Sequence, residues 1–228
     1  MRRRLMIKSA NHDEPGGRIS DYVQDGLVFH LDGKQKGDIA GAWSNLAGSG
    51  SFTNYGATSN NDHFYFDGVD DYMLSTSFSS TFFPTRTSGT IEVVIDNENL
   101  GQYGIILIPR GATRMAAGIQ SDGRFLYAAD TASARSYYCP IVTITKGSFS
   151  VSSARHYENG NEMSLSTTKT YIYGINASYN YIGKRHSNEY YFKGKIYSIR
   201  VYNKQLTEAE VMQNLAVDNI RFNLGLTL

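Results

Sequence analysis

The chain has 228 residues, 19% of them charged, and a formal net charge of +1 at pH 7. This length suits one domain with a sizeable core, and the balanced charge disfavours nucleic acid and anionic membranes as main partners. No apolar run approaches the length of a membrane span, and a single cysteine, Cys139, excludes an internal disulfide. Seventeen Tyr, 22 Gly and only four Pro are typical of many short strands joined by tight turns.

Residues 1–24 are polar and basic and include a Pro-Gly-Gly sequence at 15–17, which predicts a flexible N-terminal arm. The arm is either a disordered tail or a docking segment for a partner. Its opening, MRRRLMIK, begins like a signal peptide, but the apolar stretch 5–7 is shorter than the roughly 7 to 15 residues that an export signal needs. We therefore expect no export by the general secretory route.

From residue 25 onwards, segments rich in β-branched and aromatic residues recur between turn signals such as Asp-Gly and Asn-Gly. The predicted strands are 27–32, 63–67, 72–75, 90–95, 104–109, 115–120, 124–128, 141–146, 148–153, 169–173, 179–183 and 195–202. The last of these alternates, with Tyr197, Ile199 and Val201 on one face, as a half-buried antiparallel strand does.

The hydrophobic period changes after this last strand. Thr207 and Glu210 form a T-x-x-E capping box, and Val211 and Leu215 make an apolar stripe at helical spacing. The pattern predicts one short C-terminal helix that ends near Asp218.

Several of these segments match a known series of motifs. They are, in order, DGLVFHLD at 25–32, AWSNLAG at 42–48, FDGVDDYM at 66–73, GTIEVVID at 89–96, YENG at 157–160, YIG at 181–183 and the closing strand and helix at 190–218. The series resembles the laminin-G-like domains of the concanavalin A-like lectin/glucanase superfamily. The resemblance implies an all-β fold, a concanavalin A-like antiparallel β-sandwich (jelly roll) with one short C-terminal helix, over residues 25–228.

The same resemblance implies a non-catalytic binding module. The MRRRLM opening followed by such a domain resembles small structural proteins of phages and prophages of gut Bacteroides-like bacteria. We therefore expect a virion protein of a fibre, tail or head decoration, made in the bacterial cytoplasm, that recognises a bacterial surface glycan or another surface component. It would contact other virion proteins through the arm and could form a homo-oligomer. The alternatives are a purely architectural virion or adhesion protein, a cell-surface or extracellular location, and a divergent glycoside hydrolase.

Catalysis can be compared with the laminarinase-type glycosidases of the superfamily, which carry Glu, Asp and Glu at alternate positions of one strand. The comparable positions here are Glu92, Val94, Asp96 and Glu98, so either register lacks a carboxylate. Glu92 and Asp96 would lie about 13 Å apart at roughly 3.3 Å per residue, beyond the roughly 5 to 9.5 Å of a glycosidase pair. Asp96 and Glu98 have a spacing that a glycosidase pair permits. The alternative is that they are charged residues at a solvent-exposed end of the strand. We expect no enzyme.

Two kinds of ligand site are predicted. Asp67, Asp70 and Asp71 could converge on calcium, although aspartates in a tight hairpin turn also serve local hydrogen bonding. A glycan site needs aromatic faces beside cationic or amide groups. The candidate residues are Tyr103, Arg110, Tyr137, Tyr138, Tyr179, Arg185, His186 and Tyr190. The alternative for each tyrosine is simple packing on the sandwich.

Overall fold

The computed structural model describes residues 17–37, 41–78, 89–98, 101–110, 115–121, 124–129, 135–141, 146–152, 155–164 and 179–228. Of residues 115, 124, 126–129 and 135–141 it describes the backbone only. The helices in these ranges are one short 3-10 turn, Ile19–Asp21, and α1, Glu208–Phe222. Among the described residues, no helix has the length and apolar character of a membrane-spanning segment.

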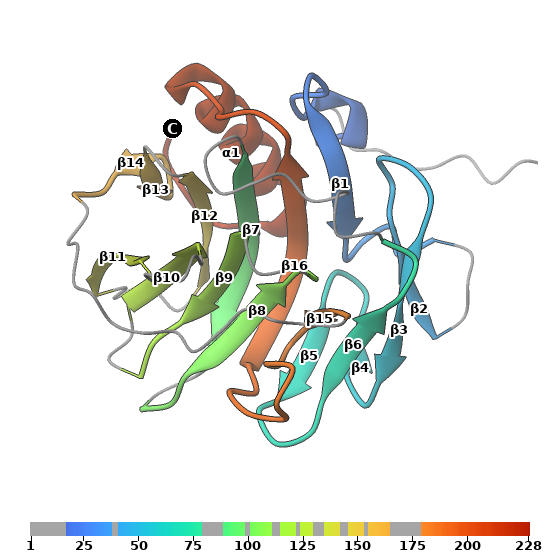
Figure 1. Cartoon of the computed structure of the whole chain (residues 1–228). Coiled ribbons are helices and arrows are strands. Elements are labelled where there is room, and N and C mark those ends of the chain that lie inside the picture. Colours follow the sequence, from blue (N-terminus) through green and yellow to red (C-terminus); the bar gives the residue numbers. More distant parts are fainter. Residues whose placement is uncertain are drawn as a thin grey trace, which may run out of the picture.

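Two antiparallel sheets face each other and form a sandwich (Figure 1). The first sheet contains, in order, β14 (Asn161–Glu162), β13 (His156–Glu158), β12 (Lys146–Ser152), β7 (Thr90–Asn97), β16 (Lys193–Tyr202), β5 (Phe64–Asp67) and β4 (Thr58–Ser59), and β1 (Leu27–Asp32) also pairs with β16. The second sheet contains, in order, β11 (Arg135–Ile141), β10 (Arg124–Ala129), β9 (Met115–Ile119), β8 (Gly104–Ile108), β15 (Asn180–Ile182), β6 (Tyr72–Ser75), β3 (Ser51–Tyr55) and β2 (Ala42–Ser44). The predicted antiparallel sandwich with a C-terminal helix is confirmed. The predicted strand 169–173 lies outside the described residues, as does most of 141–146.

The core lies between the inner faces of the two sheets, because apolar residues alternate along the strands. In β7, Ile91, Val93 and Ile95 enter this core, whereas Glu92 and Val94 lie on the outer face. Each sheet therefore has an outer face, and the side chains on it do not contribute to the core between the sheets.

A β-bulge in β16 changes the face on which one residue lies. The pairing of β16 with β7 shifts register between Ile196 and Ser198. Ile196 therefore joins Ile199 in the core, while Tyr197 packs against Phe222 on the outer face. The prediction that Tyr197 shares a face with Ile199 is wrong, because the extra residue of a bulge reverses the alternation.

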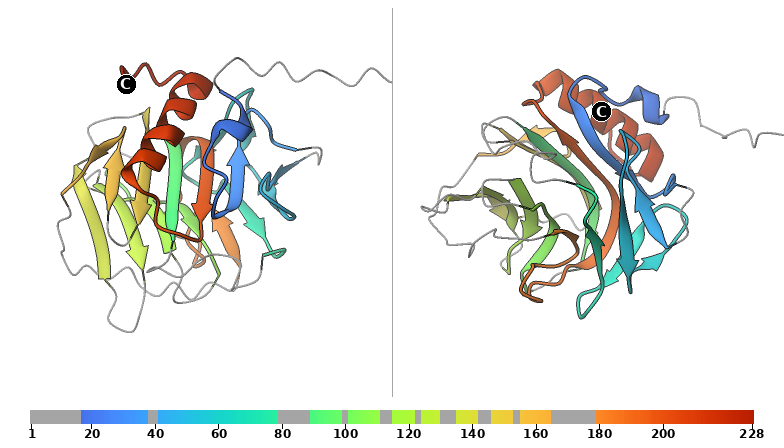
Figure 2. Two further views of the ribbon diagram at one scale, coloured as in Figure 1. Left: turned by 90° about the horizontal axis from the view of Figure 1, so that it is seen from above. Right: turned by 45° about the vertical axis from the view of Figure 1, so that its right-hand side comes forward.

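The helix α1 lies across the outer face of the first sheet, over β12, β7 and β16 (Figure 2). Its capping box is as predicted, since Thr207 Oγ1 accepts from the backbone N–H of Glu210 at 3.3 Å and Glu210 accepts from the N–H of Thr207 at 2.8 Å. The helix continues to Phe222, one turn beyond the predicted end. Its buried stripe includes the polar residues Asn214, Asp218 and Arg221. Apolar residues at helical spacing do not mark such a polar stripe in the sequence.

The segment before β1 also packs on this outer face. Tyr22 and Val23 are buried, the Tyr22 hydroxyl donates to Asp218 at 2.8 Å, and the Val23 N–H donates to Asn214 Oδ1 at 2.8 Å. Residues 17–24, which fall inside the segment predicted as an arm, are thus attached to α1. Residues 1–16 lie outside the described residues.

Candidate functional site

Four tyrosine rings follow one another across the outer face of the second sheet, and we call them the tyrosine row. They are Tyr55, at the end of β3, Tyr72, at the start of β6, Tyr181 in β15, and Tyr179 just before β15. Successive ring centroids are 4.8, 6.3 and 6.3 Å apart. The row forms because Met73 and Ile182, next to two of these tyrosines, point into the core, which turns their neighbours outward.

Lys184, in the loop after β15, joins the middle of the row. Its ammonium nitrogen lies 3.7 Å from the centroid of Tyr72 and 5.1 Å from that of Tyr181, and it donates to Asn188 Oδ1 at 2.6 Å. The residue is 5% exposed, and burial lowers the pKa of its ammonium group. The cation therefore holds the two rings together through cation–π contacts, which strengthen as water is excluded.

A second aromatic group borders the row. The ring centroids of Tyr103 and Tyr190 are 5.1 Å apart, and the guanidinium of Arg185 lies 5.5 Å from the Tyr190 ring. Arg185 is also ion-paired with Glu189 at 3.0 Å. Tyr190 and Tyr181 pack against the same small apolar cluster on the outer face of β8 and β9. The structure thus brings together the predicted residues Tyr103, Tyr179, Arg185 and Tyr190.

The other residues predicted to contact a glycan lie less close to the tyrosine row. Arg110 is exposed, and its backbone N–H donates to the side chain of Asn180, which follows Tyr179. His186 is half-buried, and burial followed by the charge of Arg185 lowers the pKa of its ring. Tyr137 and Tyr138 belong to β11, where only the backbone is described. Strands β10, β9 and β8 separate β11 from β15, so these two tyrosines lie far along the sheet from the tyrosine row.

Sequence reasoning missed Tyr55, Tyr72, Tyr181 and Lys184. The predicted candidates lie in loops and are close in sequence, whereas these tyrosines meet through strand pairing. Tyr55 is directly opposite Tyr72 in the pairing of β3 with β6. The available signal was the strand alternation itself, which places Tyr72 opposite in direction to the core residue Met73.

Asp67, Asp70 and Asp71, which we call the aspartate cluster, lie in the hairpin between β5 and β6. One carboxylate oxygen from each residue lies within 4.8 Å of the others. Asp67 accepts from the N–H groups of Val69 and Asp70 at 2.8 and 3.3 Å, and Asp71 accepts from the N–H of Asp67 at 2.9 Å. Burial raises the pKa of Asp71, whereas backbone hydrogen bonds outweigh burial and lower the pKa of Asp67. The geometry suits local turn chemistry and also offers oxygen ligands of the kind that calcium takes.

The carboxylates compared with a glycosidase site have partners of their own. Glu92 is 2% exposed and faces α1, where its Oε2 accepts from Arg200 Nε at 3.0 Å and from Asn214 Nδ2 at 2.7 Å. Asp96 is ion-paired with Lys195 at 2.8 Å. Glu92 therefore belongs to the contact between helix and sheet and is covered by α1.

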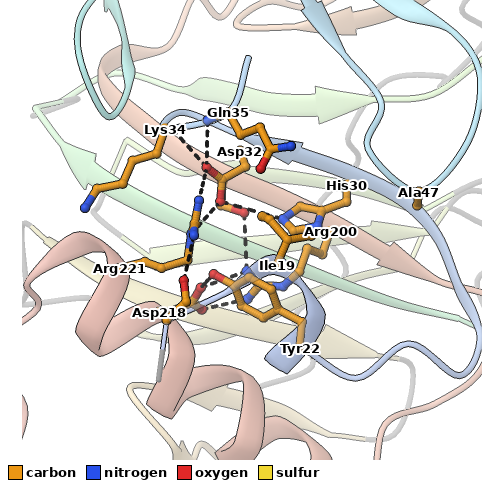
Figure 3. A network of polar contacts seen from close by, with 12 residues as sticks. Ile19, Tyr22, His30, Asp32, Lys34, Gln35, Ala47, Arg200, Asp218 and Arg221 are labelled. Atoms are coloured by element: carbon orange, nitrogen blue, oxygen red, sulfur yellow. Dashed lines mark hydrogen bonds and ion pairs between the residues drawn. The ribbon is translucent and has the colours of Figure 1, made fainter. Parts of the chain in front are cut away.

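That contact is a buried polar network (Figure 3). Arg200 donates to both oxygens of Asp218 at 2.7 and 2.6 Å, beside its bond to Glu92, and Arg221 donates to both oxygens of Asp32 at 3.0 and 2.8 Å. Burial raises the pKa of Glu92 from its usual 4.5 to about 7. The network fixes α1 to the first sheet through charge-assisted bonds, which are roughly twice as strong as neutral ones.

Comparison with known proteins assigns the family. The model of the concanavalin A-like lectin/glucanases superfamily, of laminin G type, matches residues 67–212. The chain therefore belongs to this superfamily, and the resemblance seen in its motifs is confirmed at this level. No curated protein matches the chain.

Solved structures with the same fold include two carbohydrate-related proteins. Trypanosoma rangeli sialidase matches with a TM-score of 0.58 at 13% identity, over 86% of this chain and 33% of that one, and its complex with sialic acid gives a TM-score of 0.59 at 12% identity with the same coverage. A structure of botulinum neurotoxin type C, whose cell entry depends on two ganglioside molecules, matches with a TM-score of 0.58 at 12% identity, over 85% of this chain and 52% of that one. The chain spans only a third to about half of these neighbours, and at such identity the likeness shows the fold alone.

Proposed function

We propose that the chain is a non-catalytic carbohydrate-binding module and that the tyrosine row is its contact surface. The observation that carries the proposal is the row of four tyrosine rings on one outer face of the sandwich, with Lys184 over the two middle rings. Aromatic faces pack on the C–H surfaces of sugars. Tyrosine hydroxyls supply hydrogen bonds for sugar hydroxyls.

The structural neighbours support this class of ligand. The sialidase was solved with sialic acid, and the neurotoxin interacts with gangliosides. Both are larger than this chain and share only its fold, so they support a glycan as ligand without indicating which glycan.

A binding role is better supported than hydrolysis. Val94 stands where a carboxylate would be needed in either register, and Glu92 is covered by α1 and paired with Arg200. Tyr55 and Tyr179, each 44% exposed, belong to one continuous aromatic row. Large aromatic side chains that remain open to solvent favour a contact surface.

We further propose that the glycan lies on a bacterial surface and that the chain is displayed in several copies on a phage particle. The support for the particle is the resemblance of the MRRRLM opening to phage structural proteins. One shallow site is expected to bind weakly, because each sugar hydroxyl exchanges a bond to water for a bond to protein. Several copies would raise apparent affinity by roughly 10² to 10⁴. Calcium at the aspartate cluster and contacts of the arm with other virion proteins stay predictions.

The test is a glycan array that includes bacterial capsular polysaccharides, read with the protein displayed multivalently. We expect binding to a restricted set of glycans and its loss in the double variant Tyr55→Ala, Tyr179→Ala. The matched control is Tyr65→Ala, which removes a tyrosine of β5 in the first sheet. Silence across the array, with the protein folded, would favour the architectural alternative.

A further inference from the structure

The two end rings of the tyrosine row are the accessible ones. Tyr55 and Tyr179 are each 44% exposed, whereas Tyr72 and Tyr181 are partly buried. An aromatic side chain can stack on a sugar only where a ring face is open to solvent. The row therefore offers two stacking platforms, one at each end.

The middle of the row is filled by the protein itself. Tyr55 stacks on Tyr72 at 4.8 Å with an interplanar angle of 6°, and the ammonium of Lys184 lies 3.7 Å from the Tyr72 centroid. Two groups this close cannot share one face of a ring, so both faces of Tyr72 are covered. Tyr181 meets Tyr179 edge to face at 87° and packs on the apolar cluster of β8 and β9. Neither face of Tyr72 is therefore open to a ligand.

This arrangement indicates the length of the ligand. A sugar stacked on Tyr55 has two tyrosines between itself and Tyr179, with centroid steps of 4.8, 6.3 and 6.3 Å along the row. A single sugar ring is about as large as one tyrosine ring and cannot contact both ends. A chain of sugars can do so, with its intermediate members above Tyr72 and Tyr181.

We infer that the tyrosine row binds an extended stretch of a polysaccharide, longer than a disaccharide, rather than one terminal sugar. The inference rests on the proposed function. Lys184 is a positioning residue in this arrangement, because its cation–π contacts fix the middle rings and thereby the separation of the two platforms. A preformed spacing of this kind lowers the entropy that binding a long ligand would otherwise lose.

The experiment measures affinity against ligand length. The probes are size-fractionated fragments, from monosaccharide to hexasaccharide, of the bacterial polysaccharide that gives the strongest array signal. Titrations use the full chain, shown to be monomeric by size-exclusion chromatography, so that avidity does not contribute. We expect the hexasaccharide to bind at least about tenfold more tightly than the disaccharide, as two platforms with a tenfold contribution each would give.

Two variants test the platforms separately. In Tyr55→Ala and in Tyr179→Ala we expect the ratio of disaccharide to hexasaccharide Kd to fall close to one, whereas Tyr65→Ala keeps the wild-type ratio. Equal affinity for mono- and hexasaccharide, or a length dependence unaffected by one of the two variants, overturns the inference and leaves the proposed function standing. An array without any binding overturns both.

Discussion

The buried network beneath α1 makes an unusual prediction, that removing a buried charge stabilises the protein. The change is Glu92→Gln, which keeps the shape of the side chain and an oxygen to accept from Arg200 and Asn214. Burial raises the pKa of Glu92 from 4.5 to about 7 despite the nearby charge of Arg200. A raised folded-state pKa means that the stability contributed by this group is fully present below pH 4.5 and is lost as the pH rises through 7.

The magnitude follows from the two pKa values. Each pKa unit corresponds to about 1.4 kcal/mol, so at pH 8 the ionised Glu92 makes folding about 3 kcal/mol less favourable than a neutral side chain would. Glu92→Gln should therefore match the wild type near pH 4.5 and exceed its free energy of unfolding by up to about 3 kcal/mol at pH 8. The two proteins are compared by the difference in their free energies of unfolding at each pH. Burial lowers the pKa values of His30 and His156, and because both residues titrate in either protein, their effect cancels in this difference.

Urea denaturation between pH 4.5 and 8 provides the measurement. The signal is the fluorescence of Trp43, the only tryptophan, which is fully buried. The matched control is Asp218→Asn, which also replaces a carboxylate by an amide in the same network. It places an amide group where both carboxylate oxygens accept from Arg200, and we expect a loss of about 3 to 5 kcal/mol. A Glu92→Gln variant that is less stable than wild type at pH 8, or a difference that does not change with pH, would refute the reasoning.

Three further predictions concern the arm, the aspartate cluster and catalysis. Removing residues 1–16 should leave the melting temperature unchanged. Removing residues 1–24 should lower the free energy of unfolding by more than about 3 kcal/mol, because the buried Tyr22 and its hydrogen bond to Asp218 are lost. Equal effects of the two deletions would contradict the packing of Tyr22 on the first sheet. Calcium at 100 times its dissociation constant should add about 2.7 kcal/mol if the aspartate cluster binds it, with no such gain in Asp70→Asn, and an unchanged melting temperature between calcium and chelator would leave only the turn interpretation. No reducing ends should be released from β-glucans, and release that disappears in Asp96→Ala or Glu98→Ala would establish an enzyme.

The sequence predicts well those features that depend on residues close together in the chain. The capping box at Thr207 and Glu210 appears as expected, because both residues lie in one turn of chain. The sandwich was predictable because its strands carry alternating apolar residues and its motifs occur in family order. The face of Tyr197 was not predictable, since a bulge depends on the pairing partner and not on the strand itself.

Two features of the candidate sites depend on contacts between distant segments. The tyrosine row requires the register that sets Tyr55 opposite Tyr72, and no local pattern specifies that register. The helix α1 extends past Asp218, and the polar residue in this last turn, Arg221, finds a charged partner on the first sheet in Asp32. Without those partners in view, a polar stripe is indistinguishable from a solvated helix face.

The position of Gly17 has a consequence for which surfaces of the molecule can be occupied at the same time. Its carbonyl accepts from Arg221, in the last turn of α1, at 2.6 Å, so the described chain begins behind the first sheet. The tyrosine row lies on the outer face of the second sheet, and the whole core separates the two. Residue 17 therefore lies on the side of the sandwich opposite the tyrosine row. A ligand on the tyrosine row and a neighbour in contact with α1 would occupy opposite sides of the sandwich and would not compete for one surface.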